Sequence, residues 1–306
     1  MVESKGLEDR AKDPKNISFT ADYHTYFKLF YGLPFANEIC DFSHGQEAFE
    51  AMAGGNVASN LSLIPIFEAR YKGTDAAIRK YIEMKGIRQV LSLAAGMEPR
   101  GIAFADKYSD MVYVETDISG MFENKSALAD SIFSRHKLKN RGGLHFHVAN
   151  ALISEQLEEA LVHFSPNKPL IIVNEGLLAY YSEKDNRVIM QNVHNILSRF
   201  GGVWITSDTS LNRENRKILF SHVANIKQTT AKVEKGTGRN YDEKGFVDNE
   251  HAEKLLTSEG FNIREYGQDE LGYHLNSLDK VGLDKTTFEQ VAGNIRQHVK
   301  AWAMSI

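Results

Sequence analysis

A run of small residues follows a short apolar segment in the sequence LSLAAGMEPRG, residues 91–101. In an open parallel sheet, ligands bind beyond the carboxyl ends of the strands, and a small-residue loop lets backbone N–H groups approach them closely. The next strand-like segment, VYVETD, ends at Asp117, 21 positions after Gly96. A carboxylate at that place can accept hydrogen bonds from both hydroxyls of a ribose. The two features together predict a nucleoside site.

The loop lacks the glycine pattern of a dinucleotide site. That pattern requires three glycines spaced G-x-G-x-x-G, whereas this loop contains Gly96 followed by Gly101. The sequence therefore favours a ligand that has a nucleoside and no pyrophosphate. S-adenosylmethionine is one such ligand.

Strand-like and helix-like segments alternate through the middle of the chain, which predicts βαβ units and a mostly parallel sheet. The nearly all-apolar run Leu170–Val173 fits a sheet that helices cover on both faces. The expected strands lie within residues 88–94, 111–117, 144–150, 169–175 and 202–208, and the expected helices within 102–108, 126–136, 154–164 and 183–200.

Helical patterns flank this core on both sides. Before it, apolar residues recur at helical spacing from Ile17 to about Tyr81, which predicts a cap of several helices. After it, we expect a polar helix to about Lys232, a loop over 234–245, a helix and strand over 250–267, a last strand at 272–277 and a helical tail that includes Val299 and Trp302.

These patterns predict an α/β fold with a Rossmann-like, mostly parallel sheet, an N-terminal helical cap and C-terminal helical additions. Four parts are expected along the chain. They are the cap (1–80), the nucleoside-binding core (81–211), a helical insertion or lid (212–245) and the C-terminal part of the same domain (246–306).

Composition narrows the classes of protein. The chain of 306 residues has a formal net charge of -4 with acids and bases interspersed, which disfavours nucleic-acid binding. A single cysteine, Cys40, excludes an internal disulfide framework and fits a reducing compartment. No apolar stretch reaches the roughly 20 residues of a membrane span, and the polar N-terminus does not read as a secretory signal. We expect a cytoplasmic protein.

Three stretches carry a resemblance to a known family. They are EARYKGTDAAI (68–78), GIRQVLSLAAGMEPRG (86–101) and NEGLLAYYSEKD (174–185). In this order and spacing they resemble the leucine carboxyl methyltransferase family, class I S-adenosylmethionine-dependent enzymes that include polyketide O-methyltransferases of the tetracenomycin type. The chain departs from the family pattern at four positions, where it has Lys72, Ala94, Glu98 and Tyr181. The resemblance runs from about Ser18 to Ser210.

The resemblance implies roles for individual residues around S-adenosylmethionine. The loop residues Ala94, Gly96 and Arg100 would lie at the methionine part of the cofactor, and Asp117 would hold the ribose hydroxyls. Arg70 would pair with the cofactor's carboxylate, for which a guanidinium fork is well suited. Asn150 could pair with the adenine edge or form a turn after its strand.

Glu175 ends the fourth strand on the ligand side of the sheet. It could contact the cofactor's ammonium or shape the acceptor pocket, whereas a capping role at a helix start is the competing interpretation. Methyl transfer mainly requires in-line positioning, and a carboxylate acceptor needs no base, whereas a hydroxyl acceptor would gain from one. Candidates by position for that role are Tyr23, His24, His147, Tyr180 and Asp208.

The predicted function is an S-adenosylmethionine-dependent O-methyltransferase acting on a carboxylate or hydroxyl, with a small molecule favoured over a protein C-terminus as acceptor. The alternatives are a nucleotide-dependent oxidoreductase and a non-catalytic binding protein on a degenerate methyltransferase fold. His145 and His147 share one strand face without an evident third ligand, so no metal site is expected.

Overall fold

Seven strands form one sheet at the centre of the protein. The structure is a computed structural model, and it describes residues 14–54, 57–118, 122–224, 226–237 and 244–306. The order of the strands across the sheet is β3-β2-β1-β4-β5-β7-β6, and β7 runs opposite to the other six strands. The strands are β1 (Gln89–Leu93), β2 (Val112–Asp117), β3 (Leu144–Val148), β4 (Leu170–Asn174), β5 (Gly202–Thr206), β6 (Asn262–Tyr266) and β7 (Ala301–Ser305). The predicted mostly parallel sheet is confirmed.

Helices cover both faces of the sheet. One face packs against α6 (Ile64–Lys85), α7 (Arg100–Lys107) and α8 (Phe122–His136), and the other against α9 (Ser154–Ala160), α10 (Glu183–Phe200) and α13 (Asn249–Ser258). Successive strand residues point to opposite faces. In β4, Leu170 and Ile172 join the core under α9 and α10, whereas Ile171 and Val173 join the core under α6 and α7.

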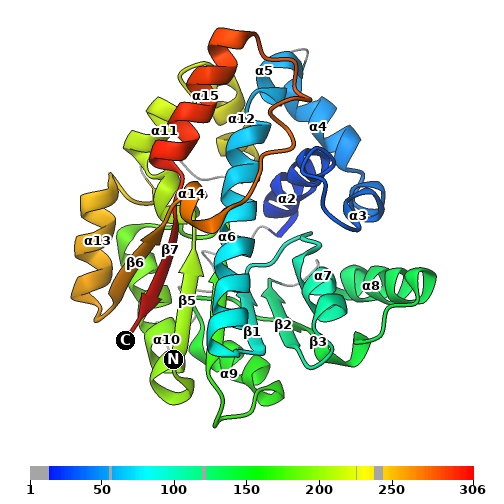
Figure 1. The fold of residues 1–306 in the computed structure, drawn as a ribbon, viewed down its shortest axis with the longest axis vertical. Coiled ribbons are helices and arrows are strands. Elements are labelled where there is room, and N and C mark those ends of the chain that lie inside the picture. The colour runs from blue at the N-terminus through cyan, green and yellow to red at the C-terminus, as the bar shows by residue number, and fades with distance from the viewer. Residues whose placement is uncertain (1–13, 55–56, 119–121, 225, 238–243) are drawn as a thin grey trace.

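A third group of helices gathers at one end of the molecule, at the upper end of Figure 1. Its aromatic and aliphatic core includes Phe27, Phe49, Ile64, Leu219 and Val291. The helices are α2 (Pro14–Lys28), α3 (Ala36–Phe42), α4 (Gly45–Ala53), α5 (Val57–Leu61), α11 (Arg213–Leu219), α12 (Ile226–Thr237) and α15 (Lys285–His298). The cap thus draws on both ends of the chain.

The remaining elements are short. They are α14 (Gln268–Leu271) and the 3₁₀ turns η1 (Arg141–Gly143), η2 (Leu161–His163), η3 (Leu178–Tyr180) and η4 (Asp208–Leu211). The predicted loop over 234–245 falls partly outside the described residues, and α12 occupies its start. No helix in the described ranges has both the length and the apolar character needed to cross a bilayer.

Two predictions near the C-terminus are wrong. Residues 272–277 form no strand, because the amides of Asn276 and Ser277 donate to the buried carboxylate of Glu68, both at 2.8 Å, instead of to a neighbouring strand. The tail helix ends at His298, and Trp302 lies in β7. Because the first four residues of β7 are buried, the strand reads as an apolar run that periodicity cannot distinguish from a helix.

Two adjacent glycines before and at the start of β5 give a matched test of this packing. A Cβ on Gly202 would lie 2.0 Å from the backbone oxygen of Leu170, whereas a Cβ on Gly201 would meet nothing within 4 Å. Both have positive φ. We expect Gly202→Ala to lower the free energy of unfolding by about 3 kcal/mol or more, and Gly201→Ala by about 1 kcal/mol. The two free energies of unfolding are measured by urea unfolding, and equal losses in the two variants would contradict the register of β5 against β4.

Candidate functional site

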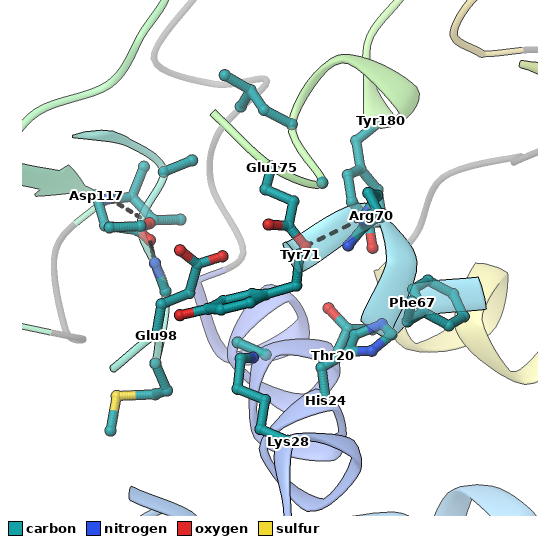
Figure 2. A pocket seen from close by; sticks show the side chains of 18 of the residues that line it. Thr20, His24, Lys28, Phe67, Arg70, Tyr71, Glu98, Asp117, Glu175 and Tyr180 are labelled. Atoms are coloured by element: carbon teal, nitrogen blue, oxygen red, sulfur yellow. Dashed lines mark hydrogen bonds and ion pairs between the residues drawn. The ribbon is translucent and has the colours of Figure 1, made fainter. Parts of the chain in front are cut away.

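A pocket of about 140 Å³, here called the inner pocket, lies where β1, β2 and β4 end. The loops after these strands form its floor, and α2 and α6 supply the opposite wall, as Figure 2 shows. Its lining includes Lys28, Arg70, Ala94, Gly96, Glu98, Asp117 and Glu175. The inner pocket thus lies at the carboxyl edge of the sheet, where the position of the small-residue loop predicts a site.

The loop after β1 and the end of β2 are tied together through Asp117. One carboxylate oxygen accepts from the amide of Gly96 at 2.7 Å, and the other accepts from the amide of Ile118 at 2.8 Å. Burial raises the pKa of Asp117, while these two amides lower it. The amine of buried Lys125 donates to the carbonyl of Gly96 at 2.6 Å and forms an ion pair with Glu115. The loop is held in shape from both sides.

Ala94 adopts a backbone conformation that favours glycine. Its φ is 51°, in the left-handed region, and Gly96 has φ 49°. The family pattern has glycine where this chain has Ala94. The alanine therefore keeps the turn at a strain of about 1–2 kcal/mol, and its side chain lines the pocket.

Arg100 lies beneath the pocket with 1% of its side chain exposed. It forms ion pairs with three carboxylates, Asp75 on α6, Glu98 in the loop after β1 and Glu175 after β4, the last two at 2.6 Å. Its guanidinium carbon also lies 4.3 Å from the centre of the Tyr71 ring. Burial raises the pKa of Glu98 to about 7, although the Arg100 guanidinium lowers it. Arg100 therefore joins three elements that meet at the pocket.

Both cations and anions line the inner pocket. The Nε of Arg70 donates to Glu175 at 3.1 Å, the contact drawn as a dashed line in Figure 2. Burial raises the pKa of Glu175, but Arg70 and Arg100 more than offset this, so that it lies below its usual value. Lys28 reaches the pocket from α2 with 8% exposure, and burial lowers its pKa. This set of charges suits a ligand that carries both an ammonium and a carboxylate.

Asp208 fixes the turn that follows Glu175. Its carboxylate accepts from the backbone amides of Gly176, Leu177 and Leu178 and from the side-chain amide of Asn174, at 2.6–2.9 Å. With four donors and 2% exposure, it serves as the anchor of this turn and does not line the inner pocket.

A larger cavity of about 1140 Å³, here called the outer chamber, adjoins the inner pocket. Thr20, His24, Phe67 and Tyr180 line both cavities and form a shared wall. Farther from this wall, α11 and α12 border the chamber, and its apolar lining includes Leu63, Leu211, Phe220, Val223 and Ile226. The arrangement gives two adjoining sites with one common boundary.

The structure brings most of the predicted site residues together. Arg70, Ala94, Gly96, Asp117, Glu175, Tyr180 and His24 line the inner pocket, and Tyr23 lines the outer chamber, where its hydroxyl donates to Asn60 at 3.1 Å.

Three other candidates lie elsewhere. Arg100 is beneath the pocket instead of in its lining. The side chain of Asn150 accepts from the amide of Leu152 at 3.0 Å, which is the turn-forming alternative, and it does not line the pocket. His147 lies on edge strand β3, 2.7 Å from the Nε2 of His163, away from both cavities.

Lys28 and Glu98 also line the inner pocket, although neither was predicted as a site residue. The available signal for Lys28 was a lone lysine among the aromatic residues of TADYHTYFKLF, and Glu98 stands where the resemblance placed an aspartate. Across the described ranges, no group of three or more histidine, cysteine, aspartate or glutamate side chains is placed to hold a metal ion.

A family model described as leucine carboxyl methyltransferase matches residues 33–194, more than half of the chain. The chain belongs to the leucine carboxyl methyltransferase family. The match includes most of α10 and the strands β1, β2 and β4, whose following loops form the floor of the inner pocket. The predicted resemblance is confirmed, and the chain has the family and the fold of S-adenosylmethionine-dependent methyltransferases.

One solved structure with a TM-score above 0.5 shares the fold at low sequence identity, and two others are more distantly similar. A DUF574 family protein from Streptomyces avermitilis is 13% identical, with a TM-score of 0.52 over 94% of this chain and 96% of that one. A putative O-methyltransferase from Nostoc punctiforme is 10% identical, with a TM-score of 0.48 over 80% of this chain. A magnesium protoporphyrin IX methyltransferase from Synechocystis, solved with SAH, is 11% identical, with a TM-score of 0.44, covering 79% of this chain and 86% of that one. The chain spans 60% of the Nostoc protein. No curated protein matches the sequence.

The ion pairs of Arg100 with Asp75, Glu98 and Glu175, here called the Arg100 cluster, are expected to stabilise the protein. Arg100→Ala would leave Asp75 and Glu98 buried without their main counter-charge, and we expect a loss of about 3–5 kcal/mol in the free energy of unfolding. Arg199→Ala is the control, because Arg199 and its partner Glu158 are 53% and 50% exposed. Its expected cost in urea unfolding is at most about 1 kcal/mol. A similar small cost for both variants would show that the cluster does not hold the loops.

Proposed function

We propose that this protein is an S-adenosylmethionine-dependent O-methyltransferase that acts on a carboxylate or hydroxyl of a small molecule. The observation that carries the proposal is the charge pattern of the inner pocket beside a larger chamber. Asp117 ends β2 on the ligand side, and Arg70, Lys28 and Glu175 lie in the same pocket. A ribose diol, a carboxylate and an ammonium are the polar groups of S-adenosylmethionine that such a set would bind.

Each group of the cofactor would meet a residue of suitable chemistry. Asp117 would accept from the ribose hydroxyls, and Arg70 and Lys28 would pair with the carboxylate. Glu175 would accept from the ammonium. The backbone of the loop 94–96 would pass close to the methionine part. When bound, S-adenosylmethionine supplies an electrophilic methyl group on a sulfonium.

The inner pocket is small for the whole cofactor. Its volume of about 140 Å³ is below the roughly 300 Å³ at which sites for drug-sized ligands begin. We therefore expect side chains of its wall to move when the cofactor binds. Lys28 and His24 reach the pocket from α2, a helix outside the sheet, so their displacement would leave the sheet intact.

The outer chamber would receive the acceptor. Because the two cavities share a wall at Thr20, His24, Phe67 and Tyr180, an acceptor in the chamber would approach the methyl group across that boundary. Tyr23, His24 and Tyr180 would orient the reacting oxygen, since in-line positioning is the main requirement of methyl transfer. The aromatic and aliphatic lining favours a small, partly apolar acceptor over a protein C-terminus.

The first test is calorimetric titration of the purified protein with S-adenosylhomocysteine, with NADH as the control ligand. We expect saturable binding in the micromolar range for S-adenosylhomocysteine alone. Binding of NADH alone would replace the proposal with a nucleotide-dependent oxidoreductase. If neither ligand bound, a non-catalytic protein on this fold would be the better account.

Asp117 gives a sharper prediction for the cofactor site. We expect Asp117→Ala to weaken S-adenosylhomocysteine binding by an order of magnitude or more, because a charge-assisted hydrogen bond contributes about 1.5–3 kcal/mol. Asp110→Ala is the control, since Asp110 precedes the same strand at its amino end and pairs with Arg88 on the surface. Unchanged affinity in Asp117→Ala would remove this carboxylate from the site.

A further inference from the structure

One helical face of α11 and of the residue that follows it borders the outer chamber. Arg213, Arg216, Lys217 and Phe220 all line the chamber, and they recur at the i, i+3, i+4 and i+7 spacing of a single helical face. None of the four lines the inner pocket. The chamber therefore has a wall with three cations that the proposed cofactor site does not share.

The buried part of the charge on this wall is positive. Arg216 is 8% exposed and Arg213 is half-buried, whereas Lys217 is exposed. The acids that line the chamber are Glu214, Glu234 and Asp248. None of these three acids is buried. A cation with little access to water is stabilised by a nearby anion, so this wall suits a ligand that carries a negative charge.

A guanidinium can serve the fold and a ligand at the same time. It has five N–H donors in a planar fork, and both Arg213 and Arg216 have interactions within the protein. Arg100 shows this capacity in the same molecule, because its one guanidinium forms ion pairs with three carboxylates. An arginine that the protein already holds in place can therefore still donate to an anion in the chamber.

An aromatic pair connects the cations of α11 to the wall that the two cavities share. The ring of Phe220 lies one turn after Arg216, and its centroid is 6.3 Å from that of Phe67, with 27° between the ring planes. Phe67 belongs to the shared wall. Leu63, Val223 and Ile226 add aliphatic surface to the chamber. An apolar body can thus lie between the shared wall and the cations.

We infer that the methyl acceptor is an organic anion with an apolar body, and that the cations of α11 bind an acid group distinct from the oxygen that receives the methyl group. This inference rests on the proposed function and names the class of acceptor. Because these cations line the outer chamber alone, they hold the acid group away from the methyl donor. Arg216 determines specificity and takes no part in the transfer step.

The experiment uses two fluorescent probes that share one aromatic framework. 8-Anilinonaphthalene-1-sulfonate carries an acid group, and N-phenyl-1-naphthylamine lacks it. Each probe is titrated into the full chain saturated with S-adenosylhomocysteine, so that the inner pocket is filled. We expect the sulfonate to bind, and added salt to weaken its binding more than that of the neutral probe, because salt screens ion pairs at the chamber wall.

Arg216→Met removes the buried cation and keeps an unbranched side chain. We expect it to raise the Kd of the sulfonate about tenfold or more, and the Kd of the neutral probe at most about twofold, because only the sulfonate loses a charge-assisted contact. Arg216→Lys keeps the charge and should retain most of the affinity for the sulfonate. Arg296→Met is the control, because Arg296 is 66% exposed and does not line the chamber.

Lys217→Met is tested as well, because the loss of a buried arginine can impair folding. Lys217 is exposed on the same helical face. We expect its substitution to weaken the sulfonate about threefold, as for the loss of a solvent-exposed ion pair. Unchanged affinity for S-adenosylhomocysteine in each variant shows that the fold and the inner pocket are intact.

The outcomes distinguish the proposed function from this inference. Failure of S-adenosylhomocysteine to bind the unsubstituted protein would overturn the proposed function itself. With S-adenosylhomocysteine bound, three results would overturn this inference alone. They are no binding of the sulfonate, equal losses of affinity for both probes in Arg216→Met, and unchanged affinity for the sulfonate in both Arg216→Met and Lys217→Met.

Discussion

The site depends on one buried guanidinium. Arg100 forms ion pairs with Asp75, Glu98 and Glu175, which belong to α6, the loop after β1 and the end of β4. Carboxylates at such depth are costly unless a well-placed counter-charge and hydrogen bonds compensate for lost hydration. Arg100 supplies both to all three, so the segments that form the inner pocket cannot separate without exposing unpaired buried charge. This single side chain therefore joins α6, the loop after β1 and the end of β4 at the floor of the pocket.

Asp208 stabilises a neighbouring turn through hydrogen bonds from uncharged donors. Its carboxylate accepts hydrogen bonds from three consecutive backbone amides after Glu175, and these amides would otherwise be buried without partners. The turn that carries Glu175 is therefore fixed from two directions, by Arg100 through the carboxylate and by Asp208 through the backbone. Asp117 and Lys125 do the equivalent for the loop after β1. In each case, an acid or amine that looks catalytic in isolation serves first to shape a loop.

The helical cap adds polar side chains to the inner pocket that do not belong to the loops of its floor. Lys28 and His24 come from α2, one turn apart, and both reach the inner pocket. The two side chains differ in charge. Lys28 adds to the positive potential of Arg70, and that potential helps keep His24 neutral. A single helix thus brings the cation of Lys28 into the inner pocket and the imidazole of His24 to the wall shared with the outer chamber.

The sequence by itself determined the mostly parallel sheet, the places of its first five strands along the chain and the edge at which the inner pocket lies. Local signals suffice for these features, because apolar runs, helical periodicity and a small-residue loop are properties of short segments. The spacing of the motifs also predicted three residues that line the inner pocket, Asp117, Arg70 and Glu175. The tail was misassigned because β7 pairs with β5 and β6, and strand pairing across such separations leaves no local pattern.

Only the tertiary structure decided which polar groups serve the ligand and which serve the fold. Arg100 and Asp208 proved to be internal anchors, Asn150 a turn residue, and Lys28 a member of the pocket. These roles depend on which side chains from distant segments meet one another. Whether a buried charge is already neutralised is a property of its three-dimensional neighbours, and no spacing along the chain records it.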